Sequence, residues 1–127
     1  MQSLVLYGIP NCDTVKKART WLQEHALTYN FTFDFHDFKK QGLERATVEG
    51  WLQHTSLDVL INRKGTTWRA LTDEQKTSVS DIDAAIALMI ASPSIIKRPV
   101  LQMLSSGAKV THIEVGFSAQ QYQPLFK

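Results

Sequence analysis

A strand–helix–strand pattern in the first 38 residues most strongly limits what this chain can fold into. Residues 4–7 (LVLY) form a short β-favouring run that ends at turn-forming residues. From Asp13 to about residue 25, apolar side chains recur at helical spacing. Residues 28–38 then alternate polar and aromatic side chains, which predicts a second strand. The aromatic side chains on one face of that strand are Tyr29, Phe31, Phe33 and Phe35.

The remainder of the chain predicts a helical block followed by a hairpin. Thr72 and Gln75 have the spacing of a capping box. The clearest helical pattern runs from Ser80, its expected cap, to a stop at Pro93. The other expected elements are short helices at 46–55 and 56–62, strands at 100–104 and 110–115, and a short helix at 118–126. This order suits an α/β protein in which helices cover a sheet.

The composition is that of one ordinary soluble domain. A chain of 127 residues has the length of a single domain, and it buries enough surface to fold without disulfides or metal ions. A second domain is not needed. A hydrophobic share of 43% and a formal charge of +2 do not point to nucleic acid or membrane as a partner. The aromatic row carries no interleaved basic residues, which also argues against a base-stacking surface.

The only cysteine, Cys12, stands where the first strand pattern passes into the helical pattern. A lone cysteine forms no internal disulfide, so the thiol is either buried filler or a reactive group. At the first turn of a helix, unpaired N–H groups and the dipole make a thiol easier to ionise than free cysteine, whose pKa is about 8.5. Lys16 adds to this effect, whereas Asp13 opposes it.

The N-terminal sequence predicts a cytoplasmic location. No Lys or Arg precedes Cys12, and the LVLY run is too short for a signal sequence or a membrane span. A free thiol persists in such a reducing compartment. The histidines show no metal-ligand spacing, so no metal site is expected, and His36 is expected to be a strand residue with a solvated tip.

Two arginines are candidates for stabilising a thiolate. Arg63 follows an apolar helical segment, and Arg98 directly precedes Pro99, which imposes an extended backbone and permits a cis bond. A guanidinium stabilises a thiolate and binds oxyanions with two hydrogen bonds, although each arginine taken alone fits a solvated surface. The expected loop at 65–69 adds Thr67 as a donor and Arg69 as an outer cation, with Trp68 in the core.

Three stretches occur in order along the chain: YGIPNCDTVKKA, INRKGTTWRAL and IIKRPV. Together they resemble the arsenate reductase (ArsC)/Spx family, and most closely its YffB-like branch. The resemblance implies a single thioredoxin-like domain over residues 1–127, with a mixed sheet of about four strands and a helical insertion at about 42–92. It also implies that Cys12 is catalytic and that Pro99 is cis beside the site. The residues expected to shape that site are Asn11, Thr14 and Pro99.

The resemblance also implies a chemistry, with two departures. In glutaredoxin-coupled arsenate reductases of this type, the cysteine attacks the oxyanion, glutathione forms a mixed disulfide, and three arginines support the anion. Arg63 and Arg98 match two of the arginines, but the region of the third holds only Lys109 and His112. No second cysteine stands three residues after Cys12, so an outside thiol must resolve the oxidised cysteine.

Three functions remain open on the sequence. The first is a glutathione-dependent monothiol reductase that uses a low-pKa thiolate, with glutathione as cosubstrate, glutaredoxin as a further partner and no tightly bound cofactor. The second is arsenate reduction coupled to glutathione and glutaredoxin. The third is a non-catalytic regulatory adaptor of the Spx type. A monomer that binds neither nucleic acid nor membrane is expected for the enzyme.

Overall fold

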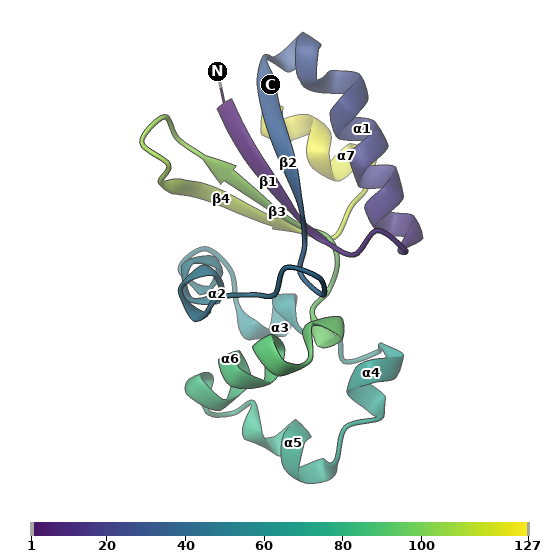
Figure 1. The fold of residues 1–127 in the computed structure, drawn as a ribbon, viewed down its shortest axis with the longest axis vertical. Coiled ribbons are helices and arrows are strands. Elements are labelled where there is room, and N and C mark those ends of the chain that lie inside the picture. Colours follow the sequence, from purple (N-terminus) through teal and green to yellow (C-terminus); the bar gives the residue numbers. More distant parts are fainter. Residues whose placement is uncertain (1, 127) are drawn as a thin grey trace. The chain divides into compact units, whose positions relative to one another are not determined.

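The computed structural model describes residues 2–126, which divide into two compact units (Figure 1). The first unit contains the described residues up to Phe38 and from Arg98 onward. The second unit contains Lys39–Lys97, and the predicted helical insertion lies within it. Each unit has its own secondary structure and is described separately below.

A mixed four-stranded sheet forms the centre of the first unit (Figure 1). The strands lie in the order β2-β1-β3-β4, with β1 parallel to β2 and antiparallel to β3. Their bounds are Gln2–Gly8 (β1), Phe31–Asp37 (β2), Val100–Leu104 (β3) and Val110–Val115 (β4). This sheet agrees with the predicted thioredoxin-like α/β fold.

Helix α1 (Asp13–Tyr29) covers one face of the sheet. Leu4 and Leu6 of β1 are buried against Leu22 of the helix, and all three side chains are at most 1% exposed. Full burial of each such side chain contributes about 1.5–3 kcal/mol. The C-terminal elements α7 (Ala119–Tyr122) and η2 (Gln123–Phe126) add Tyr122 and further aromatic rings to the same core.

Helix α1 ends four residues later than the pattern indicated. Tyr29, predicted to begin the strand face, lies in the last turn of the helix. Asn30 ends the helix with φ of 56°, and its N–H donates to the carbonyl oxygen of Ala26. Asparagine tolerates this left-handed conformation better than most residues do. Alternation alone therefore misplaced the boundary, although Tyr29 still packs against the core of this unit.

The second unit consists mainly of short helices. Their bounds are Arg45–Leu52 (α2), Leu57–Leu60 (α3), Thr66–Arg69 (α4), Asp73–Ser78 (α5), Ile82–Ala91 (α6) and Pro93–Ile95 (η1, a 3₁₀ turn). The capping box before α5 is confirmed, since Thr72 and Gln75 exchange both bonds. Two expectations were wrong: residues 66–69 form a helical turn rather than a loop, and Asp81 rather than Ser80 occupies the cap of α6.

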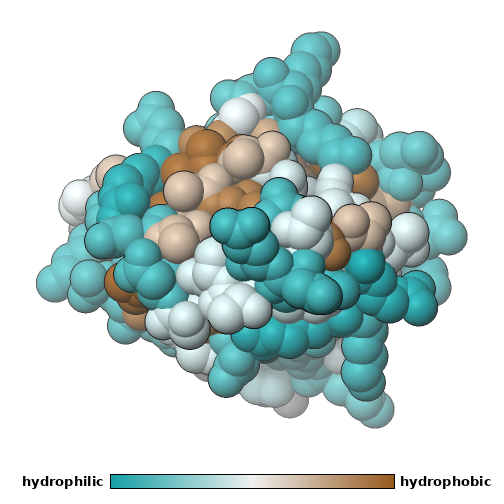
Figure 2. All heavy atoms as spheres, turned by 90° about the horizontal axis from the view of Figure 1, so that it is seen from below, coloured by the Kyte–Doolittle hydropathy of each residue, from teal (hydrophilic) through white to brown (hydrophobic). Residues whose placement is uncertain are grey.

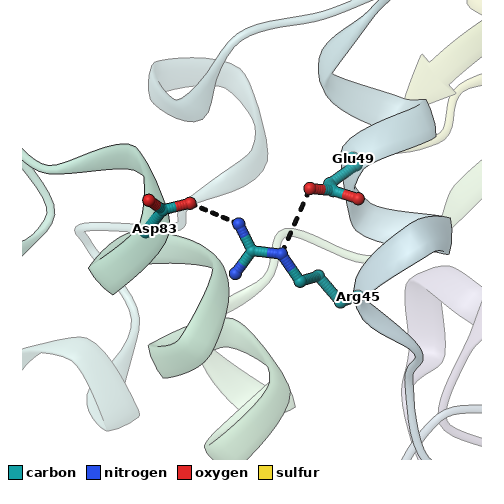
Figure 3. Close-up of polar contacts among 3 residues, drawn as sticks. All are labelled: Arg45, Glu49 and Asp83. Carbon is teal, nitrogen blue, oxygen red and sulfur yellow. Dashed lines mark hydrogen bonds and ion pairs between the residues drawn. The ribbon is translucent and has the colours of Figure 1, made fainter.

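Polar contacts connect α2 to α6 on the surface of the second unit (Figure 3). The Arg45 guanidinium donates from Nε to Glu49 at 3.1 Å and from Nη2 to Asp83. The hydrogen bond to Asp83 is the main reason that the pKa of Arg45 is raised. Because these groups are exposed, the contacts orient the two helices rather than provide much of the stability.

Candidate functional site

Cys12 lies at the N-terminal cap of α1. Its backbone is extended, with φ of −127° and ψ of 125°, and its carbonyl oxygen accepts from the N–H of Lys16 at 2.9 Å. The thiol makes no capping hydrogen bond, and the residue is half-buried. The cysteine therefore directly precedes the unpaired N–H groups of a 17-residue helix, the helix end at which negative charge is stabilised.

Gly8 allows β1 to approach the first turn of α1 closely. A Cβ atom at Gly8 would lie 2.9 Å from Cγ2 of Val15 and 3.3 Å from its Cγ1. Real Cβ atoms essentially never come that close to a neighbour. Because Val15 is fully buried, it has little room to move. The glycine thus determines how near the strand end lies to the turn that bears Cys12.

The segment Arg98–Pro99 lies at the same end of the sheet as Gly8. The register pairs Val100, the first residue of β3, with Tyr7, the penultimate residue of β1. The Arg98–Pro99 peptide bond is cis, which confirms the expectation for Pro99. Pro99 also accepts a hydrogen bond from the N–H of Gly116 at 2.8 Å. The fold of the first unit thereby brings the arginine segment to the end of β1 from which the Cys12 loop leaves.

His36 is a residue at this end of the sheet that the sequence did not select. The parallel register of β1 and β2 places it beside Tyr7, and the two rings are 4.8 Å apart at 46°. His36 is a half-buried residue of β2, which confirms its expected place in a strand. No local pattern predicts this contact, because it depends on which strand pairs with β2.

The remaining residues expected near Cys12 surround the start of α1. Asn11 precedes Cys12 and is exposed, as are Thr14 and Lys16 in the first helical turn. The backbone carbonyl oxygen of Lys16 accepts a hydrogen bond from the hydroxyl of Thr20 at 3.0 Å. These positions leave the approach to the helix start polar and open to solvent. Their roles in the site stay predictions.

Arg63 lies in the second unit, where two neighbours orient it. Its Nη1 donates to Asp58 at 3.0 Å, and its guanidinium carbon lies 5.4 Å from the centre of the Trp68 ring. Trp68 is buried, as expected. Thr67 is half-buried in α4, and Arg69 is exposed at the end of that turn. Arg63 thus contacts the ring of Trp68 in α4, the helical turn that also carries Thr67 and Arg69.

The surface near Arg63 includes a hollow of about 600 Å³. Leu52, Val79 and Ile82 contribute apolar lining, and Arg63 and Lys76 contribute cations. Ile82 is 52% exposed, which is unusual for a large apolar side chain. Figure 2 shows apolar side chains gathered among polar ones on the face seen from below. The second unit thus offers solvent both apolar and cationic surface.

Residues 2–126 contain no group of three His, Cys, Asp or Glu side chains arranged to hold a metal ion. None of their helices has the length and hydropathy that a bilayer-spanning segment requires. The two residues in the region of the missing third arginine are also placed by the structure. Nε2 of His112 lies 2.7 Å from Oε1 of Glu114, and Lys109 is exposed just before β4.

Comparisons with known proteins agree with the sequence resemblance. A solved structure called YFFB (PA3664) protein is 42% identical and has a TM-score of 0.81, over 98% of this chain and 99% of that one. An arsenate reductase (ArsC) related protein from Brucella melitensis is also 42% identical, with a TM-score of 0.67 over 98% and 95% of the two chains. The global transcriptional regulator Spx of Streptococcus pyogenes serotype M3 is 27% identical over 101 residues, or 77% of this chain and 70% of Spx.

The family match covers the elements that form the site. It runs over residues 7–125, from the end of β1 through the Cys12 turn, the second unit and the cis-proline to the last helical turn. Since this match spans nearly the whole sequence, and relatives of 42% identity extend over almost their full length, the chain belongs to the ArsC family.

Proposed function

We propose that this protein is a thiol-dependent reductase in which Cys12 is the nucleophile and glutathione is the cosubstrate. The observation that carries the proposal is the half-buried, uncapped thiol of Cys12 at the start of α1. The register of β1 and β3, which brings the Arg98–Pro99 segment to the end of β1 from which the Cys12 loop leaves, supports the same assignment. The name of the Brucella relative, an arsenate reductase related protein, is consistent with reductive thiol chemistry.

The proposed reaction is a pair of thiol–disulfide exchanges. The Cys12 thiolate attacks one sulfur of an oxidised substrate disulfide, which forms a mixed disulfide and releases the other sulfur as a thiolate. Because Cys12 is the only cysteine of the chain, an outside thiol must then attack the mixed disulfide. Glutathione supplies that thiol and leaves in the new disulfide, restoring the Cys12 thiolate. Glutaredoxin is the proposed partner for reducing the glutathione mixed disulfide that is released.

The two arginines have distinct proposed roles. Arg98 stabilises the thiolate, because the register of β1 and β3 holds its segment at the end of β1. Arg63, oriented by Asp58 and Trp68, binds an anionic group of substrate or glutathione. Arsenate is the less favoured substrate, because the carboxylate of Glu114 offsets any charge on His112. A multiply charged oxyanion approaching a thiolate needs more positive charge than this.

Mass spectrometry after incubation with oxidised glutathione tests the proposal. We expect a glutathione adduct on Cys12, released by reduced glutathione, and no adduct in Cys12→Ser. Alkylation by iodoacetamide should proceed at neutral pH and slow in Arg98→Gln, whereas the matched variant Arg45→Gln, in the second unit, should leave the rate unchanged. Alkylation with the pH profile of an ordinary exposed cysteine, together with no adduct, contradicts the proposal.

The Cys12→Ser variant also distinguishes a reductase from an adaptor, when its partner binding and its disulfide turnover are both measured. Spx, to which this chain is 27% identical, is named as a transcriptional regulator, so partner binding without chemistry is the alternative outcome. An adaptor would bind its protein partner equally well after Cys12→Ser. A reductase would lose disulfide turnover completely in the same variant.

A further inference from the structure

A cationic pocket lies within the second unit and shares Asp58 and Arg63 with the apolar hollow. It has a volume of about 500 Å³, and its charged residues are Arg63, Lys64, Lys97 and Asp58. Three cations against one carboxylate leave an excess of two positive charges. We refer to these four residues, together with the pocket they line, as the basic pocket.

The backbone that carries the basic pocket is held by cross-links between two distant segments. The N–H of Asn62 donates to the carbonyl oxygen of Ile95 at 2.8 Å, and the N–H of Lys97 donates to that of Leu60 at 2.7 Å. An isolated antiparallel bridge joins Ile61 to Ile96 between these bonds. Lys97 is therefore fixed opposite the segment that leads into Arg63, although 34 positions separate them in sequence.

The turn that bears Arg63 and Lys64 is also constrained. The side-chain oxygen of Asn62 accepts from the N–H of Lys64 at 3.2 Å, and its carbonyl oxygen accepts from the N–H of Gly65 at 3.2 Å. A Cβ atom at Gly65 would lie 2.9 Å from Nδ2 of Asn62. The two Asn62 bonds hold the turn, which brings two adjacent cations to the pocket.

Arg63 retains donors for a ligand. A guanidinium has five N–H groups, and the ion pair with Asp58 involves Nη1. Contact with the Trp68 ring restricts the plane of the guanidinium further. A cation oriented in this way loses less entropy when it binds a carboxylate with two hydrogen bonds.

We propose that the basic pocket binds a small organic dianion whose two negative groups are separated by a short uncharged linker. Arg63 receives one anionic group, and Lys64 with Lys97 receives the other. The volume is within the usual range for organic ligands and far exceeds what an inorganic ion fills. The excess charge of two matches a dianion, and Val59, 46% exposed on the wall, provides an apolar contact for the linker. This inference extends the anion-binding role proposed for Arg63 and does not depend on the thiol chemistry of Cys12.

Titration with glutarate, followed by NMR amide shifts, tests the proposal. The titration is made in the full chain carrying Cys12→Ser, so that thiol exchange does not contribute. We expect saturable shifts at the amides of Lys64, Gly65 and Lys97 that weaken as salt is added. Butyrate, which keeps the linker and has one carboxylate, should bind more weakly, and inorganic phosphate should not reproduce the saturation.

Two variants of equal charge assign the binding to the pocket. Lys64→Gln/Lys97→Gln should weaken glutarate binding by about two- to thirtyfold, because two partly exposed ion pairs are lost. Lys17→Gln/Lys109→Gln removes the same charge from exposed positions of the first unit and should leave binding unchanged. Equal losses in both variants, equal binding of butyrate, or shifts elsewhere in the chain would overturn the proposal.

Discussion

Replacing Gly8 by alanine tests how the end of β1 positions the Cys12 turn. The new methyl group would meet Cγ2 of Val15 at 2.9 Å and Cγ1 at 3.3 Å. Val15 is fully buried in the first half of α1, so the contact is relieved only if the helix start or the strand end shifts. The turn between Gly8 and Val15 contains Cys12, which is why the substitution should also alter the reactivity of the thiol.

The expected destabilisation follows from the cost of adding one methyl group to a packed core, which is about 1–3 kcal/mol. Val15→Ala should restore room for it, because this substitution removes both Cγ atoms that the new methyl would meet. The single variant Val15→Ala should itself cost about 2 kcal/mol, since two methyl groups leave the core. The double variant should therefore be more stable than the sum of the two losses predicts, by about 1–3 kcal/mol.

Urea unfolding of the four proteins measures this coupling, and iodoacetamide alkylation measures the thiol in each. Gly50→Ala is the matched control, because Gly50 lies in helix α2 and a Cβ there meets nothing within 4 Å. The free energy of unfolding of this control should rise by up to about 1 kcal/mol, because alanine favours a helix more than glycine does. The rate of Cys12 alkylation should stay unchanged. Strictly additive losses, or Gly8→Ala as stable as the parent, would refute the argument that close packing positions the site.

Three further predictions concern elements outside the site. Burial, together with the carboxylate of Glu114, raises the pKa of Tyr122, so the unfolded chain loses the phenolic proton first as pH rises. Unfolding free energy should fall above pH of about 10 by up to ~1.4 kcal/mol per pH unit, a decline that urea titration should find absent in Tyr122→Phe. At pH 7 the same variant should be more stable by about 1 kcal/mol, because within residues 2–126 the buried hydroxyl has no hydrogen-bond partner, and a loss would contradict this. Thr72→Ala should remove the capping box and cost about 1 kcal/mol locally, seen as faster amide exchange in α5 but not in α1. Asn30→Gly should raise the melting temperature slightly and Asn30→Ala should lower it, because φ at this helix end is 56°.

Local signals account for the parts of the fold that the sequence predicted well. The β1 run, the start of α1 at Asp13 and the capping box at Thr72 each depend on residues within one turn or strand. The errors occurred where local signals compete. Tyr29 fits both a helix face and an alternating strand, and the left-handed Asn30 that separates the two cannot be seen in periodicity. Likewise, residues 66–69 resemble a polar loop but form a helical turn over the buried Trp68.

The sequence by itself determined which groups this protein has for its chemistry: one cysteine at a helix start, an arginine before a proline, and no second thiol to resolve the first. Only the tertiary structure decided which of these groups meet. Strand register brings Arg98 and cis-Pro99 to the end of β1, places His36 against Tyr7, and in the second unit sets Lys97 opposite the turn that bears Arg63. The physical reason is that pairing between distant segments follows from burial and hydrogen bonding of the whole sheet and helical unit, which no short stretch of sequence encodes.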